Sequence, residues 1–149
     1  MPINAMVMKL LKYVFIVCYA ALFLYTVFFA RRRRNMTRRY LNIYPLRNTI
    51  HEFHVTNFRE KGDVVNFISN LAGNFILFIP YTFILLVLFG YKNYRITLLS
   101  VFLLSLSTEI LQYVFKVGVA DVDDVLLNTL GGWAGILVCK ALQRRIGLI

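Results

Sequence analysis

Acidic residues are scarce in this chain of 149 residues, which carries seven Asp and Glu against seventeen Lys and Arg. Charged residues make up only 16% of the sequence and hydrophobic residues 59%, so a soluble single domain is not expected. The net charge of +10 could suggest nucleic acid, but in so apolar a chain it more often reflects basic flanks that contact anionic headgroups. No nucleic-acid recognition module is present, so we predict the lipid bilayer as partner and no nucleic acid.

Cysteine is nearly absent, and histidine is equally rare. Cys18 and Cys139 have no neighbour at metal or redox spacing, and we predict that both are small packing residues within apolar segments. His51 and His54 lie three residues apart beside Glu52, but zinc needs a third or fourth ligand of this kind. A structural or interfacial role is therefore favoured for the two histidines.

Long apolar runs dominate the rest of the sequence, and a run of about 20 such residues is enough to cross a bilayer as a helix. Residues 31–63 form the one long connection, and its four consecutive arginines follow the first run as a stop-transfer pattern, which favours a retained helix over a cleaved signal peptide. We predict an all-α fold: one polytopic membrane domain over 1–149, a four-transmembrane-helix bundle with a basic 31–63 loop. The predicted helices cover about residues 10–30, 66–89, 96–115 and 122–142.

Polar side chains gather between the last two apolar runs. A carboxylate at the centre of a membrane helix costs about 2.5–3.5 kcal/mol on insertion scales, so several of them close together indicate a polar site. Asp124 could instead cap the last helix and meet the positive end of its dipole, but this explains only one aspartate. The polar residues of this region are Ser105, Glu109, Gln112, Asp121, Asp123, Asp124 and Asn128.

The second predicted helix carries a row of amides, since Asn66, Asn70 and Asn74 are four residues apart and share one face. The row either hydrogen-bonds to neighbouring helices or lines a polar pocket, and the sequence leaves both open. Gly131 and Gly135 have the spacing that lets another backbone approach closely. We expect them to pack the fourth helix against the second or third and to assemble the polar faces into one site, with homodimerisation as the weaker alternative.

These patterns predict a ligand-binding site but assign no catalytic residue, because no Ser–His or Cys–His pair is placed for covalent catalysis. No cofactor is predicted. If a divalent cation were held, its oxygen ligands would be Glu109, Asp121, Asp123 and Asp124. The predicted ligand-binding residues are Asn70, Asn74, Ser105, Glu109, Gln112, Asp121, Asp123, Asp124, Asn128 and, from the arginine run, Arg34.

Three segments, 70–80, 105–112 and 121–131, together resemble the VanZ-like family in their order and spacing, and the resemblance extends over about residues 40–140. The segment 42–46 resembles a loop motif of the family, with Leu46 where Phe is usual. The resemblance implies a small multi-pass protein of the bacterial plasma membrane. It also implies a link to the glycopeptide teicoplanin, because the founding member of the family is associated with low-level resistance to it. The resemblance thus implies a resistance phenotype but does not identify a chemical reaction.

Three functions compete on this basis. The first is a non-enzymatic envelope protein whose site binds a lipid headgroup, a lipid-linked cell-wall precursor or an amphiphilic antibiotic, and so contributes to teicoplanin tolerance. The alternative is a metal-assisted intramembrane hydrolase or transferase that acts on a lipid-linked phosphate. A third, proton-coupled export with Glu109 as the carrier, would require four-span subunits to form oligomers and ranks last.

Overall fold

The computed structural model of the chain describes residues 5–30 and 37–146, and these residues are almost entirely helical. Four helices are long and apolar enough to cross a membrane: Ala5–Phe29, Lys61–Leu88, Tyr94–Phe115 and Val122–Arg145. The predicted all-α fold with four spans is therefore confirmed. In chain order the elements are α1 (Ala5–Tyr25), a π-helical turn (Thr26–Ala30), β1 (Leu41–Asn42), α2 (Arg47–Val55), α3 (Lys61–Leu77), α4 (Ile79–Phe83), a second π-helical turn (Ile84–Leu88), α5 (Tyr94–Phe115), β2 (Ala120–Asp121) and α6 (Val122–Ile146).

The second span is interrupted next to Pro80. α3 ends at Leu77, and α4 begins at Ile79 with Pro80 in its first turn. Proline has no N–H to donate, and its ring clashes with the carbonyl four residues earlier, so a regular α-helix cannot continue through it. The span is thus built from three helical pieces that together pack against the rest of the bundle.

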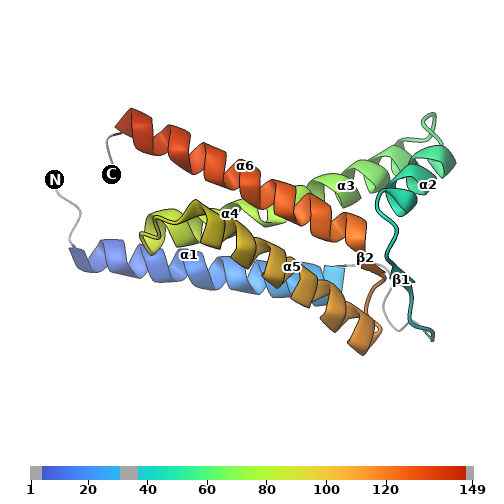
Figure 1. The fold of residues 1–149 in the computed structure, drawn as a ribbon, viewed down its shortest axis with the longest axis horizontal. Coiled ribbons are helices and arrows are strands. Elements are labelled where there is room, and N and C mark those ends of the chain that lie inside the picture. The colour runs from blue at the N-terminus through green and yellow to red at the C-terminus, as the bar shows by residue number, and fades with distance from the viewer. Residues whose placement is uncertain (1–4, 31–36, 147–149) are drawn as a thin grey trace.

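α6 is the central helix of the bundle, and it contacts α3, α4 and α5 (Figure 1). Its glycines make this packing possible. A Cβ at Gly131 would lie 1.8 Å from the backbone oxygen of Phe75 in α3, and one at Gly135 would lie 2.0 Å from Thr82 Oγ1 in α4. The predicted close packing of the fourth helix against the second span is therefore confirmed.

α1 lies at the edge of the bundle, and none of the residues Ala5–Tyr25 is buried. It contacts the second span through edge-to-face aromatic pairs. Phe15 packs against Phe83 and Phe23 against Phe78, at ring-centroid distances of 5.8 and 5.6 Å. The Tyr19 hydroxyl also donates to the Leu77 carbonyl at 3.1 Å. Large apolar side chains stay exposed along all four spans, as expected for surfaces whose solvent is lipid.

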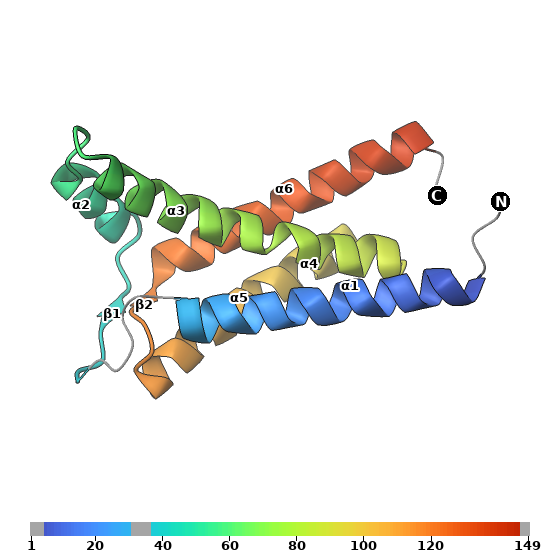
Figure 2. The ribbon, with the colours of Figure 1, turned by 180° about the vertical axis from the view of Figure 1, so that it is seen from behind.

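Two short segments close one end of the bundle (Figure 2). β1 and β2 form a two-stranded parallel pair in which Leu41 is opposite Ala120 and Asn42 is opposite Asp121. α2 follows β1 and lies beside the beginning of α3, whereas α1 begins and α6 ends at the opposite end of the molecule. The connection predicted as a basic loop thus folds, over its described part, into a cap on the polar end.

Candidate functional site

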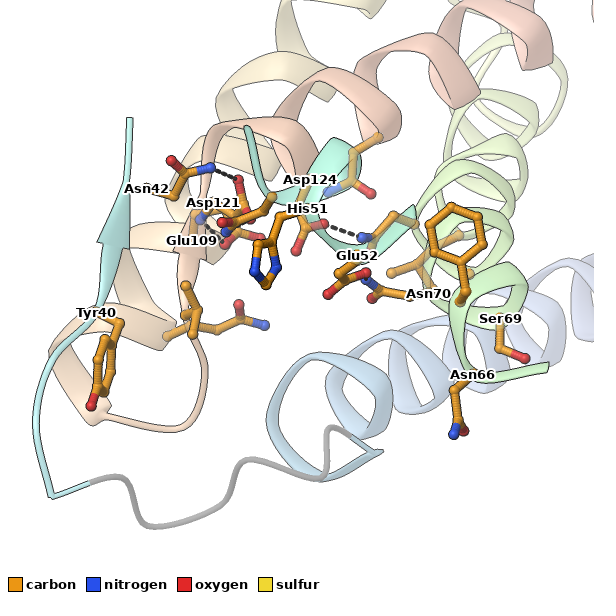
Figure 3. A pocket seen from close by; sticks show the side chains of 18 of the residues that line it. Tyr40, Asn42, His51, Glu52, Asn66, Ser69, Asn70, Glu109, Asp121 and Asp124 are labelled. Atoms are coloured by element: carbon orange, nitrogen blue, oxygen red, sulfur yellow. Dashed lines mark hydrogen bonds between the residues drawn. The ribbon is translucent and has the colours of Figure 1, made fainter. Parts of the chain in front are cut away.

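Beneath this cap lies a cavity of about 1230 Å³. Its wall is contributed by the first π-helical turn, β1, α2, α3, α5, β2 and α6, so it joins all four spans (Figure 3). Asn74 lies thirteen residues along α3 from Lys61, which places it about 20 Å from the start of that helix. The cavity therefore extends from the capped end into the bundle, between the apolar spans.

Most of the acidic residues of the chain meet in this cavity. Five of the seven line it, although the sequence separates them by up to 72 residues. The described basic side chains that share the wall are Arg47 and His51. A chain with a net charge of +10 thus concentrates its negative side chains at one place. The five carboxylates belong to Glu52, Asp63, Glu109, Asp121 and Asp124.

Asp121 is the hub of the polar network. Its Oδ1 accepts from Asn42 Nδ2 at 2.9 Å and from the Asp123 N–H at 3.0 Å, and its Oδ2 accepts from Asn48 Nδ2 at 2.5 Å. Its own N–H donates to Glu109 Oε2 at 3.0 Å. Because Asp123 lies in the first turn of α6, Asp121 satisfies a free amide at the start of that helix. The capping role that the sequence suggested for Asp124 is therefore filled by Asp121.

Asp123 faces α2 and is not among the residues that line the cavity. Its Oδ1 accepts the Leu46 N–H, and its Oδ2 accepts the Thr49 N–H at 3.1 Å and the Thr49 hydroxyl at 2.9 Å. Leu46 is the N-cap of α2, and its apolar side chain cannot accept a hydrogen bond from the free amides of the helix. A carboxylate from α6 thus supplies the cap that α2 itself lacks, and it holds the helix in place.

The amide row of α3 combines the two roles that the sequence left open. Asn74 is buried and donates to Asp124 Oδ1 across the interface between α3 and α6, and Asn70 donates to Glu52 Oε2 of α2 at 3.1 Å. Asn66, Asn70 and Asn74 all line the cavity as well. The row therefore binds neighbouring elements and at the same time forms one wall of the site, as Figure 3 shows for Asn66 and Asn70.

The most buried polar side chains of the cavity wall lie on α5 and α6. Asn128 is only 3% exposed, and its Nδ2 donates to Ser105 Oγ at 2.8 Å. Asn128 lines the cavity, whereas Ser105 lies behind it and supports it. Gln112, which is 1% exposed, also lines the cavity, and it donates to the Val27 carbonyl at 3.0 Å. This bond ties α5 to the end of the first span.

The structure brings together most of the predicted site residues. Asn70, Asn74, Glu109, Gln112, Asp121, Asp124 and Asn128 line one cavity, whereas Ser105 and Asp123 contact it only through partners. Arg34 lies outside the described residues. Within residues 5–30 and 37–146, no group of three or more His, Cys, Asp or Glu side chains is arranged to hold a metal ion.

Sequence reasoning missed the contribution of the segment that follows the arginine run. Asn42 and Asn48 hold Asp121, and Glu52 lines the cavity beside Asn70. The one available signal was that Asn42 begins the segment 42–46, which resembles a family loop motif. The apolar residues around it gave no reason to place it against the aspartates.

The fold and the cavity define a class: a multi-pass helical membrane protein with a polar cavity at one end of its bundle. The sequence model of the VanZ/LLP1 family matches residues 11–143, and the chain belongs to that family. The chain is similar to Protein VanZ of Enterococcus faecium, with 35% identity over 102 residues, which cover 68% of this chain and 53% of that protein. The chain thus matches about half the length of this relative. No solved structure matches it.

Proposed function

We propose that this protein works in the bacterial plasma membrane and raises the tolerance of the cell envelope to a glycopeptide such as teicoplanin. It does so by binding an amphiphile in the cavity: a lipid, a lipid-linked wall precursor or the antibiotic. The observation that carries the proposal is the polar cavity that extends between apolar spans and is lined by five carboxylates and seven carboxamides. Kinship with the VanZ/LLP1 family and similarity to Protein VanZ support the link to the envelope.

The wall of the cavity suits an amphiphile because it carries apolar as well as polar side chains. Val27, Leu77 and Phe78 add apolar surface beside the polar groups, and the cavity extends from the capped end of the bundle in between the apolar spans. Binding sites of this kind combine apolar walls with a few placed polar groups that fix orientation. A polar head can therefore enter the cavity while its hydrocarbon tail stays in the bilayer.

The hydrogen bonds of the aspartates favour binding over metal-assisted turnover. Asp121 and Asp123 accept from amides and a hydroxyl of their own chain, which positions β1 and α2. A two-carboxylate or larger oxygen cage for Mg²⁺ or Ca²⁺ would need these oxygens to point at one ion. In the described part of the chain the carboxylates are not arranged in that way. The hydrolase or transferase alternative thus has no specific contact in its favour.

Glu109→Gln is expected to remove most of the teicoplanin protection that the unaltered chain confers on a susceptible bacterium. The substitution keeps an oxygen for the Asp121 N–H but removes the charge from the cavity wall, and a hydrogen bond to a charged group is worth about 1.5–3 kcal/mol. Binding should therefore weaken by about tenfold or more. The measurement is the minimal inhibitory concentration, compared at equal abundance of protein in the membrane.

Gln143→Leu is the matched control, because Gln143 lies near the other end of α6 and outside the cavity wall. It should protect as well as the unaltered chain. Full protection by Glu109→Gln would contradict a role of the cavity, and absence of protection by the unaltered chain would contradict the proposed function itself.

A further inference from the structure

The cavity wall mixes two kinds of polar group in nearly equal number. Seven of the lining residues carry a carboxamide, and five carry a carboxylate. Hydrogen bonds pair several of them: Asn42 and Asn48 donate to Asp121, Asn70 donates to Glu52, and each pair joins two different elements. Hydrogen-bond acceptors and donors therefore stand side by side around the cavity. A carboxylate only accepts, whereas a carboxamide does both.

This mixture distinguishes between classes of ligand. A phosphate only accepts hydrogen bonds and would meet five carboxylates of its own charge. An ammonium group only donates hydrogen bonds and cannot accept one from the amide N–H groups. A hydroxyl both donates and accepts, so neighbouring hydroxyls on one ring match a wall of alternating amides and carboxylates. Phe67 adds an apolar face to the same wall, against which the C–H face of a sugar ring can pack.

Asn128 supplies a second, independent observation. Its side chain is 97% buried, since only 3% is exposed, and it lines the cavity. Its Nδ2 donates to Ser105, but its Oδ1 has no hydrogen-bond partner among the described residues. A buried acceptor without a donor is costly, and few such groups occur in native proteins. Asn128 lies one helical turn from Asp124, so a donor that reaches it also meets the acidic wall.

We propose that the cavity binds the sugar headgroup of a membrane amphiphile, and that one of its hydroxyls donates to Asn128 Oδ1. The inference rests on the proposed function and names the ligand class for the same site. The shared chemistry is a glycosyl group, which either a membrane glycolipid or a glycopeptide antibiotic can supply. Sites that hydrogen-bond a hydroxyl discriminate strongly against analogues that lack it, because their buried polar groups are then left unpaired.

The test uses the purified full-length chain in nanodiscs that contain diglucosyldiacylglycerol, diacylglycerol with the same acyl chains, or phosphatidylethanolamine. Lipid that stays bound is measured by native mass spectrometry. Diglucosyldiacylglycerol should be retained over the other two lipids, and Asn128→Leu should weaken its binding about tenfold, as expected for the loss of one buried hydrogen bond. Gln143→Leu, on the same helix but outside the cavity wall, should bind like the unaltered chain.

Competition then separates the two sources. Displacement by teicoplanin but not by its sugar-free aglycone would assign the site to the antibiotic, and retention against both would assign it to a glycolipid. Equal retention of diacylglycerol, preference for phosphatidylethanolamine or equal competition by the aglycone would each overturn the inference.

If Asn128→Leu does not accumulate in the membrane, Asn70→Leu at an exposed position of the wall replaces it, and its glycolipid binding is compared with that of the unaltered chain in the same way. These results depend on lipid binding alone, whereas the proposed function stands or falls on teicoplanin protection by the unaltered chain.

Discussion

Gly131→Ala is expected to destabilise the protein by about 3 kcal/mol, at the upper end of what overpacking a protein interior costs. The added Cβ would lie 1.8 Å from the Phe75 carbonyl oxygen and 2.8 Å from its carbon. Both are backbone atoms of α3, so no side chain can turn away, and α6 would have to move from its neighbours. The loss should appear as a lower thermal midpoint and a smaller monodisperse fraction in mild detergent.

Gly73→Ala is the matched control, because Gly73 is also a helix-interior glycine and nothing lies within 4 Å of the Cβ that it would gain. Alanine is the better helix former by about 1 kcal/mol, so this variant should be at least as stable as the unaltered chain. Equal stability of the two variants would show that α6 does not contact α3 at Gly131.

Asp123→Ala is expected to release α2 from the end of α6. Three donors lose their acceptor: the N–H groups of Leu46 and Thr49 and the Thr49 hydroxyl. Hydrogen bonds to a charged group contribute about 1.5–3 kcal/mol, and losing several that act together should lower the local opening energy by about 3 kcal/mol. Amide hydrogen exchange over residues 47–55 should then accelerate about a hundredfold, while α5 and α6 keep their protection.

Glu60→Ala removes a carboxylate from the connection before α3, where the side chain caps no amide, and it should leave exchange in α2 unchanged. Asp123→Asn keeps one acceptor oxygen and should fall between the two. If Asp123→Ala abolished ligand binding without changing exchange in α2, Asp123 would act on the ligand directly and not through the position of α2.

The spans were predictable because their signal is local. A run of about 20 apolar residues identifies a membrane helix whatever it packs against, and the polar stripes on α3 and α5 follow from helical spacing alone. The close approach at Gly131 was also visible in the sequence, since only small residues let two helix backbones approach closely. These features fixed the fold class and the wall contributed by Asn70, Asn74 and Glu109.

The cap that β1, β2 and α2 form on the bundle was not predictable, because its contacts join residues more than seventy positions apart. The pairing of Asn42 with Asp121 depends on a two-residue parallel strand pair, too short to show a period of its own. The sequence offered Asp124 as a helix cap and did not distinguish Asp121 from Asp123, yet the three side chains have different partners. Asp123 holds α2, whereas Asp121 and Asp124 line the cavity. Which aspartate faces which partner is decided by tertiary packing.

Cysteine labelling in native membranes tests most directly whether polar groups of several spans enclose one water-accessible cavity. Gly73→Cys and Ile76→Cys are compared in a background with Cys18→Ala and Cys139→Ala. Gly73 lies in the cavity wall about 18 Å along α3, and Ile76, 57% exposed, lies outside that wall at nearly the same depth. A water-soluble thiol reagent should modify Gly73→Cys and spare Ile76→Cys. Protection of both residues, or equal modification of both, would contradict the account.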